Sequence, residues 1–257
     1  MEILDWAAIL GALAWTPHVF SVIKNAVTKP VIRVITKRDG EIGFTVLGPI
    51  FNIRIAFSVE NRDIVVSGLK IKLVHESGEE KIFEWQGIRQ QVLKMTAPDG
   101  SVLPYEKEQS VLAIKLNQKE IEERSIECQE TLYLNNKYDL ELAAVKKLSY
   151  LKQQEKYEPK EFIACQEMTD LYSFIKQSFS WKTGRYTATI ELHSPEEFKL
   201  VDNQYEFILT PIDIERLEKN KQNIELDYKN NFVPQNDKEF KKVDWNWCNP
   251  TLKKLTN

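Results

Sequence analysis

The chain is poor in the residues from which reactive centres are built. Its 257 residues include three cysteines and three histidines, and none of these six side chains is close to another in the sequence. An odd number of widely spaced cysteines argues against a disulfide framework and suits a reducing compartment. No spacing among them matches a zinc site. We therefore expect no metal, no cofactor and a main domain on the cytoplasmic side.

Glycine is also scarce, and the nine glycines form neither a phosphate-cradling loop nor a dinucleotide fingerprint. No cysteine has the flanking histidine or glycine elbow that an activated nucleophile needs. His75, beside Glu76, is one candidate for a general base, but it ends a predicted strand at a turn, where we expect it to be exposed. The sequence thus predicts no catalytic residue. An enzyme with a site assembled from dispersed residues, His75 and His193 among them, remains an alternative.

Neither sign of charge dominates the composition. The chain has 35 basic and 38 acidic residues, which gives a net charge of -3 and a pI near 5.8. A basic excess that would favour nucleic acid is therefore missing. No pattern of residues indicates a small-molecule ligand either.

One long apolar run stands out, at residues 3–23, where 15 of 21 residues are apolar. A helix of this length is about 32 Å long, just enough to cross the hydrocarbon core of a bilayer. Pro17 should kink it. We predict that residues 1–28 form an N-terminal apolar helix that anchors the protein to a membrane. The residues predicted to make the anchor are Trp6, Ile9, Leu10, Leu13, Trp15 and Phe20.

The charges that flank this run are asymmetric. Acidic residues precede it, whereas Lys24, Lys29 and Arg33 follow it. The positive-inside rule then places the C-terminal side in the cytoplasm, and these three cations are predicted to contact lipid headgroups. Two other interpretations remain: a helix docked on this protein or on a partner, and a signal peptide, for which the acidic start is unsuited.

From residue 31 onward the pattern changes to short alternating strands separated by turns. The clearest alternation places Ile53, Ile55, Phe57 and Val59 on one face. Such a pattern of short alternating strands is typical of an antiparallel sandwich or barrel. From 117 to 179 it gives way to helical spacing, with helices expected at 118–127, 138–154 and from Pro159 onward, so we predict a helical hairpin inserted between two strands. Strands return after Ser180, and residues 224–228 are expected as a last edge strand.

The stretch 181–192, WKTGRYTATIEL, resembles a late strand of immunoglobulin-like sandwich modules, in which a glycine two residues before a tyrosine commonly opens the strand. The fold predicted is therefore mainly β with helices: an antiparallel immunoglobulin-like β-sandwich over 29–229 with the helical insertion. Two small sandwiches bridged by helices, as in arrestin-like proteins, are the alternative. The resemblance implies no activity.

The C-terminal tail, 230–257, is rich in lysine and asparagine and contains Trp245 and Trp247. Two tryptophans so near the end predict a tail that docks back on the body, with a partner-binding peptide as the alternative. Taken together, these features predict a non-catalytic, membrane-anchored cytosolic protein that binds or scaffolds another protein. The alternative is a soluble subunit of a complex that uses its N-terminal helix to bind a partner.

Overall fold

The computed structural model describes residues 28–96, 102–109, 113–232, 238 and 240–255 together with Thr16, and for 88–96 and 102–109 it describes the backbone alone. This part of the chain is mainly β with helices, as predicted from the sequence. The predicted anchor at 3–23 lies outside the described residues except for Thr16. Among the described helices, none is long and apolar enough to cross a membrane.

Most of the strands belong to one sheet. In chain order the strands are β1 (Val31–Thr36), β2 (Glu41–Thr45), β3 (Gly48–Glu60), β4 (Ile64–Val66), β5 (Gly68–His75), β6 (Glu80–Thr96), β7 (Val102–Gln109), β8 (Ile114–Leu116), β9 (Ile121–Glu130), β10 (Gly184–His193), β11 (Lys199–Val201), β12 (Gln204–Leu209), β13 (Trp247–Cys248) and β14 (Lys253–Lys254). Within the described residues the main sheet has 12 strands and runs β11-β1-β3-β9-β6-β5-β10-β12-β14, with β2 beside β3, β13 beside β2 and β7 beside β6. Strand β11 runs parallel to β1, and β4 pairs separately with β8.

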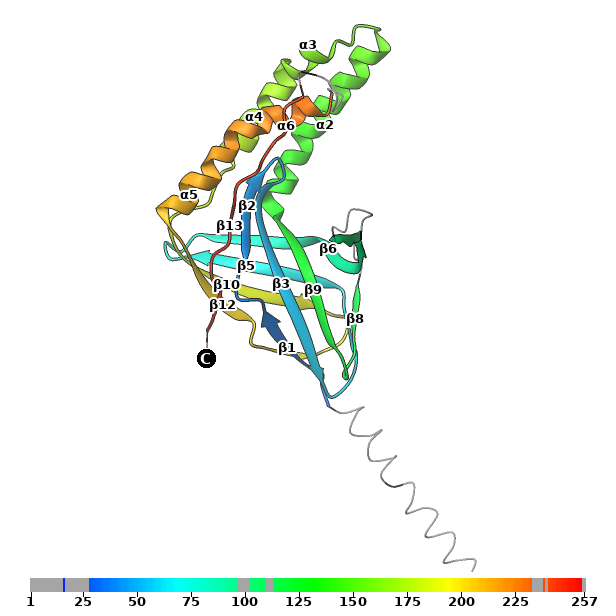
Figure 1. The fold of residues 1–257 in the computed structure, drawn as a ribbon, viewed down its shortest axis with the longest axis vertical. Helices are drawn as coiled ribbons and strands as arrows, with labels where there is room; N and C mark the ends of the chain where they lie inside the picture. Colours follow the sequence, from blue (N-terminus) through cyan, green and yellow to red (C-terminus); the bar gives the residue numbers. More distant parts are fainter. Residues whose placement is uncertain are drawn as a thin grey trace, which may run out of the picture.

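The sheet is curled into a half-barrel around the hydrophobic core (Figure 1). On β3 the alternation seen in the sequence buries Ile53, Ile55, Phe57 and Val59 to 3 % exposure or less. Stacked rings extend this core across the sheet: the centroid of Phe207 lies 5.5 Å from that of Phe51 and 5.1 Å from that of Tyr186. Burial of such large side chains supplies most of the driving force for this fold.

The two ends of the sheet approach each other at the turn between β11 and β12. Strand β11 pairs with β1, whereas β12 pairs with β10 on the opposite side. The hydroxyl of Tyr205 on β12 lies 3.2 Å from the carbonyl oxygen of Val34 on β1. Asp202, in the turn, forms ion pairs with Arg33 (2.6 Å) and Lys254 (2.8 Å). These contacts hold the curled sheet in shape.

The helices are α2 (Thr131–Gln153), α3 (Pro159–Ile163), α4 (Gln166–Gln177), α5 (Pro211–Glu218), the 3-10 helix η1 (Lys219–Asn223) and α6 (Ile224–Asn230). Helix α2 follows β9 directly, and α2, α3 and α4 all lie between β9 and β10 in the chain. Together with α6 they project beyond one end of the sheet and form what we call the helical arm (Figure 1). Helix α5 starts at a capping box, in which Thr210 and Asp213 hydrogen-bond reciprocally, with Pro211 in the first turn.

Two elements differ from the sequence-based prediction. The charged segment expected as a helix at 118–127 is instead strand β9, because pairing with β3 and β6 buries Ile126 and Cys128 completely. The edge strand expected at 224–228 is helix α6. Ile224 and Tyr228 are also four residues apart, so a helix turns both toward the arm, where Ile224 is fully buried.

The strands before and after the helical insertion belong to one sheet, since β10 pairs with β5 along its length. The predicted immunoglobulin-like sandwich is not confirmed. The stretch that suggested it does form a strand, β10, which begins at Gly184. The helix expected from Pro159 onward begins there but is divided into α3 and α4 around Ala164 and Cys165.

Candidate functional site

The cations predicted to contact lipid headgroups are engaged with carboxylates where the structure describes them. Lys29 lies 2.6 Å from Glu197, and Arg33 contacts both Asp202 (2.6 Å) and Glu60 (3.7 Å). Lys24 lies outside the described residues, as do the anchor residues Trp6, Ile9, Leu10, Leu13, Trp15 and Phe20. A lipid phosphate would therefore compete with carboxylates for Lys29 and Arg33.

The tryptophans of the tail lie against the body of the protein. Trp247 belongs to β13, which pairs with β2 opposite Gly43, and Trp245 packs against the hydrophobic core. A side chain at Gly43 would be impossible without displacing Trp247, since a Cβ there would lie 2.2 Å from the indole ring. Both tryptophans are half-buried in this position.

A row of asparagines holds the extended tail along the helices. Asn220 is fully buried, and its amide nitrogen donates to the carbonyl oxygens of Phe44 (2.9 Å) and Asn246 (2.8 Å). Its amide oxygen accepts from the backbone N–H of Asn246 (2.8 Å). Farther along, Asn223 donates to the carbonyl of Asp244 (2.9 Å) and Asn230 to that of Lys241 (2.8 Å). Three asparagine side chains thus bind three backbone carbonyls spaced along the tail, which fixes the register of the tail against the helices.

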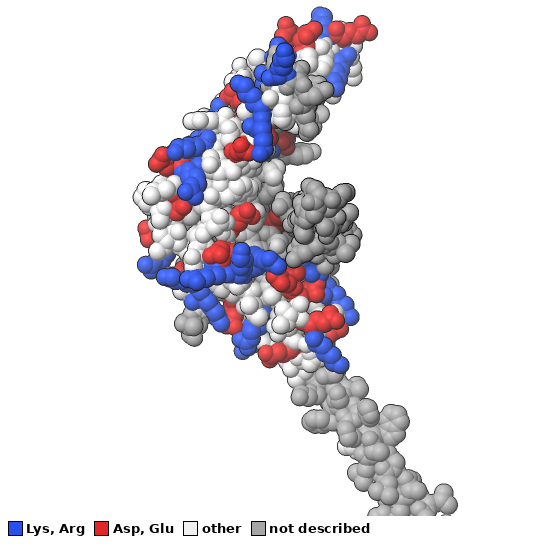
Figure 2. Space-filling view, viewed as in Figure 1, with Lys and Arg blue, Asp and Glu red and all other residues white. Residues whose placement is uncertain are grey.

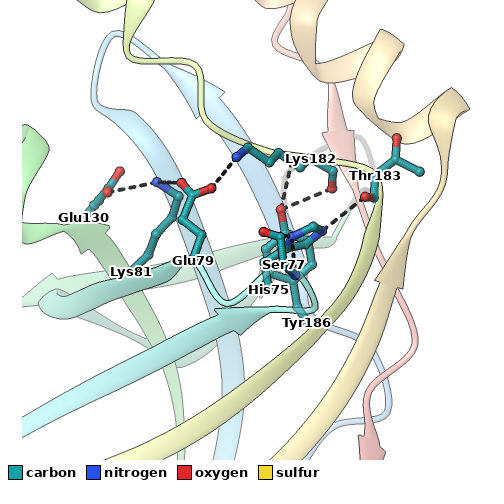
Figure 3. A network of polar contacts seen from close by, with 8 residues as sticks. All are labelled: His75, Ser77, Glu79, Lys81, Glu130, Lys182, Thr183 and Tyr186. Atoms are coloured by element: carbon teal, nitrogen blue, oxygen red, sulfur yellow. Dashed lines mark hydrogen bonds and ion pairs between the residues drawn. The ribbon is translucent and has the colours of Figure 1, made fainter.

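His75 is buried rather than exposed, contrary to the expectation from the sequence. It is the last residue of β5 and is 8 % exposed, and its ring lies against the turn that leads to β6 (Figure 3). Nε2 is 3.1 Å from the carbonyl oxygen of Thr183, so it carries the hydrogen and donates it. Nδ1 then accepts from the backbone N–H of Ser77 (3.2 Å). Both ring nitrogens are used in the fold, which leaves His75 without a free lone pair for general-base catalysis, and His193 is exposed on β10.

The same turn explains the glycine and tyrosine of the 181–192 stretch. Gly184 has φ +135°, and a Cβ there would lie 2.7 Å from His75 Nε2 and 2.4 Å from an oxygen of Glu76. Two residues on, the hydroxyl of Tyr186 accepts from the backbone N–H of Lys182 (2.8 Å). The Gly-x-Tyr spacing therefore lets the chain pass close to the histidine and then fixes it there.

A chain of charges connects this turn to the base of the helical arm (Figure 3). The ammonium group of Lys81 lies 3.2 Å from the carboxylate of Glu130, the residue before α2, and 3.4 Å from that of Glu79. The carboxylate of Glu79 also lies 2.5 Å from the ammonium group of Lys182. Lys81 and Glu130 are 10 % and 11 % exposed in their side chains. The hydrogen bond from Lys182 holds the pKa of Glu79 below its ordinary value. This network ties α2 to the sheet and has a structural role.

The cysteines are poorly placed for nucleophilic chemistry. Cys128 and Cys248 are buried, whereas Cys165 is partly exposed at the start of α4. Burial raises the pKa of all three thiols, that of Cys248 to about 11. A raised pKa lowers the thiolate fraction at neutral pH. Within the described part of the chain, no group of three or more histidine, cysteine, aspartate or glutamate side chains could hold a metal ion.

A surface hollow of about 520 Å³ lies over the outer side of β3 and β9 and the corner between β1 and β2. Charged groups of both signs line it, among them Lys37, Asp39, Arg54, Glu123 and Glu127. Arg54 already forms an ion pair with Glu123. Small-molecule sites are mostly apolar with few polar groups, so this lining points to no particular ligand.

The face of the molecule seen in Figure 2 carries basic and acidic side chains side by side, over both the arm and the sheet. Such mixing agrees with the balanced composition. A row of basic side chains crosses the middle of this face, and acidic side chains border it above and below (Figure 2).

Helix α2 is apolar on two sides. Its inner side packs on α4, where the rings of Tyr133 and Phe174 stack with centroids 5.5 Å apart, and where Ala144 is buried. Leu148 also packs against the core, whereas Val145 is 56 % exposed. Tyr138 is 63 % exposed, and Leu142 is partly exposed between them. We call Tyr138, Leu142 and Val145 the α2 seam.

The α2 seam is the strongest candidate for a functional surface in the described residues. Its members follow one another at intervals of four and three residues, so they share one stripe of the helix. A helix that buries one stripe and exposes another apolar one is suited to bind on its second side. The spacing was readable in the sequence, but nothing there indicated that this stripe points away from the body.

No family model, no curated protein and no solved structure matches this chain.

Proposed function

We propose that the protein is a non-catalytic binding or scaffolding module that binds another protein chain through the helical arm. Its N-terminal apolar run anchors it to a membrane, with the main domain on the cytoplasmic side. The single observation that supports binding at the arm is the exposure of the α2 seam. The tail is held by Asn220, Asn223 and Asn230, and the two ends of the main sheet, β11 and β14, have three and two residues. Those two short ends offer little for strand addition, and β7 is a longer edge of eight residues that pairs with β6 alone among the described strands.

The structural use of His75 and the raised pKa values of the thiols support a non-catalytic role. Each of these groups is the type of residue that would carry acid-base or nucleophilic chemistry, and each is bound or buried in a way that weakens it for that task. The proposal therefore places function in a surface rather than in a pocket.

Vesicle flotation of the full-length chain tests the anchor. We expect the protein to float with anionic vesicles in high salt, and to lose flotation when Leu10 and Leu13 are both changed to Arg, because charges at the centre of an apolar segment are costly in hydrocarbon. The matched control changes Ile82 and Ile208 to Arg, two exposed apolar residues of the sheet. If the unaltered chain stays at the bottom of the gradient without detergent, the anchor is refuted.

The ion pairs of Lys29 and Arg33 favour a second candidate function, a soluble subunit whose N-terminal helix binds a partner protein. In that case the basic residues support the fold instead of meeting lipid. A stoichiometric partner that co-purifies from the soluble fraction, and is lost with the Leu10 and Leu13 substitutions, would support this alternative over the membrane anchor.

A further inference from the structure

The α2 seam has the spacing of a helix-pairing surface. Tyr138, Leu142 and Val145 follow the four-and-three rhythm by which apolar residues meet between two packed helices. The 23-residue helix spans about 35 Å, and Figure 1 places it along one side of the arm, with α4 and α6 on the other side. The seam is therefore open to a partner helix that lies alongside.

Two charges flank the seam along one edge. Asp139 and Lys146 are seven residues apart, which is two turns, so they lie one above the other on one edge of the seam, next to Leu142, which is three residues from Asp139 and four from Lys146. Both are exposed, and neither forms an ion pair with another residue that the structure describes. Opposite charges at this spacing on one edge are complementary to themselves when the helix is turned around.

We propose that the α2 seam pairs with the α2 seam of a second copy of this chain, with the two helices antiparallel across a two-fold axis. This rests on the proposed function, in which the arm binds another protein chain. The axis passes between Leu142 and Val145 of the two copies, so each Leu142 faces the other copy's Val145. In this register Asp139 of each copy lies opposite Lys146 of the other, which gives two symmetric ion pairs.

The antiparallel arrangement follows from the charges. Antiparallel helices place the same edge of both copies face to face, whereas parallel helices would place Asp139 and Lys146 against the opposite edge. On that edge Glu141 is already paired with Lys137 (2.7 Å) of its own helix. A parallel pair would therefore leave Asp139 and Lys146 without the partners that the antiparallel pair provides.

A seam of three apolar side chains per copy makes a small interface, and we expect a weak dimer in the micromolar range or above. Attachment of both copies to one membrane would raise their effective concentration without any new contact. The proposal therefore predicts a reversible association that is stronger on the membrane than in free solution.

The test is the oligomeric state of the full-length chain in mild detergent, followed by sedimentation equilibrium over concentrations from about 1 μM to 1 mM. Asp139→Lys alone or Lys146→Asp alone sets like charges together at both ends of the interface, and each should weaken dimerisation about tenfold or more. The double variant restores opposite charges and should recover an affinity within about threefold of the original. Val145→Glu, which places a charge in the seam itself, should give a monomer.

Asp170→Lys is the matched control, because Asp170 is an exposed aspartate of the arm on α4, away from the seam. We expect it to leave the dimer unchanged. Monomeric wild-type chain at all concentrations, a double variant no better than the single ones, or an equal loss with Asp170→Lys would each overturn the proposal. Circular dichroism of each variant separates weak pairing from failed folding, and flotation of the same samples reads the membrane anchor independently.

Discussion

Asn220 is the side chain on which docking of the C-terminal tail depends most. It is fully buried and binds the carbonyls of Phe44 and Asn246 and the backbone N–H of Asn246. Asn220→Ala removes these bonds and leaves backbone groups without partners in a buried place. Each unsatisfied buried group costs about 1–3 kcal/mol, so we expect the free energy of unfolding to fall by about 2–4 kcal/mol. For a chain of this size, each kcal/mol lowers Tm by roughly 2–4 °C.

Asn223→Ala and Asn230→Ala are the matched controls. Each removes one bond, to Asp244 and to Lys241, at a half-buried position that water reaches more readily than it reaches the fully buried Asn220. We expect each to cost about 0.5–1 kcal/mol. Urea unfolding followed by tryptophan fluorescence gives the three values under one set of conditions.

A second readout reports on the tail directly. Cys248 lies in β13 and is 1 % exposed, so its thiol should react with a sulfhydryl reagent only when the tail detaches. In a Cys165→Ser background, Asn220→Ala should speed this reaction far more than Asn223→Ala does. If Asn220→Ala costs no more than Asn223→Ala and leaves Cys248 equally protected, the asparagine row does not hold the tail.

Three further outcomes are expected. Gly184→Ala should lower the free energy of unfolding by about 2 kcal/mol or more, because φ is +135° and the new methyl group meets His75 and Glu76. Gly78→Ala is the control: φ is +87° there but the space around it is open, so we expect a loss of about 1 kcal/mol. Urea unfolding measures both values. The pKa of Glu79 in the folded protein lies below its ordinary value of 4.5, so its contribution to stability is present above that pH and is lost as the pH falls through the lowered pKa. Lys182→Ala should therefore lower the free energy of unfolding at pH 7, and in acid the variant and the wild type should have the same free energy of unfolding. Native thiol titration at pH 8 should label Cys165 first, and Cys128 and Cys248 only after denaturation.

The strands with a strict apolar alternation could be predicted from the sequence, since a period of two on β3 and β5 matches one buried and one wet face. The cap of α5 was equally readable, because Thr210, Pro211 and Asp213 act on their own helix end. In both cases the physical cause lies within the segment itself.

Where the cause lies elsewhere in the chain, the sequence was a poor guide. Strand β9 is rich in charged residues and became a strand because β3 and β6 pair with it on either side. His75 was expected to be exposed, yet the distant loop at Thr183 covers it. The outward direction of Val145 depends on which side of α2 packs on α4, and no local pattern fixes that choice.

The central claim is that the outward side of α2 is where this protein binds another chain. The most direct measurement is the magnetic coupling between spin labels on different copies, with one label at Val145→Cys in a Cys165→Ser background and the full-length chain in vesicles. We predict strong coupling that disappears on dilution with unlabelled protein, and none for a label at Asp170→Cys on α4. Absence of coupling at position 145, or equal coupling at both positions, would contradict the account.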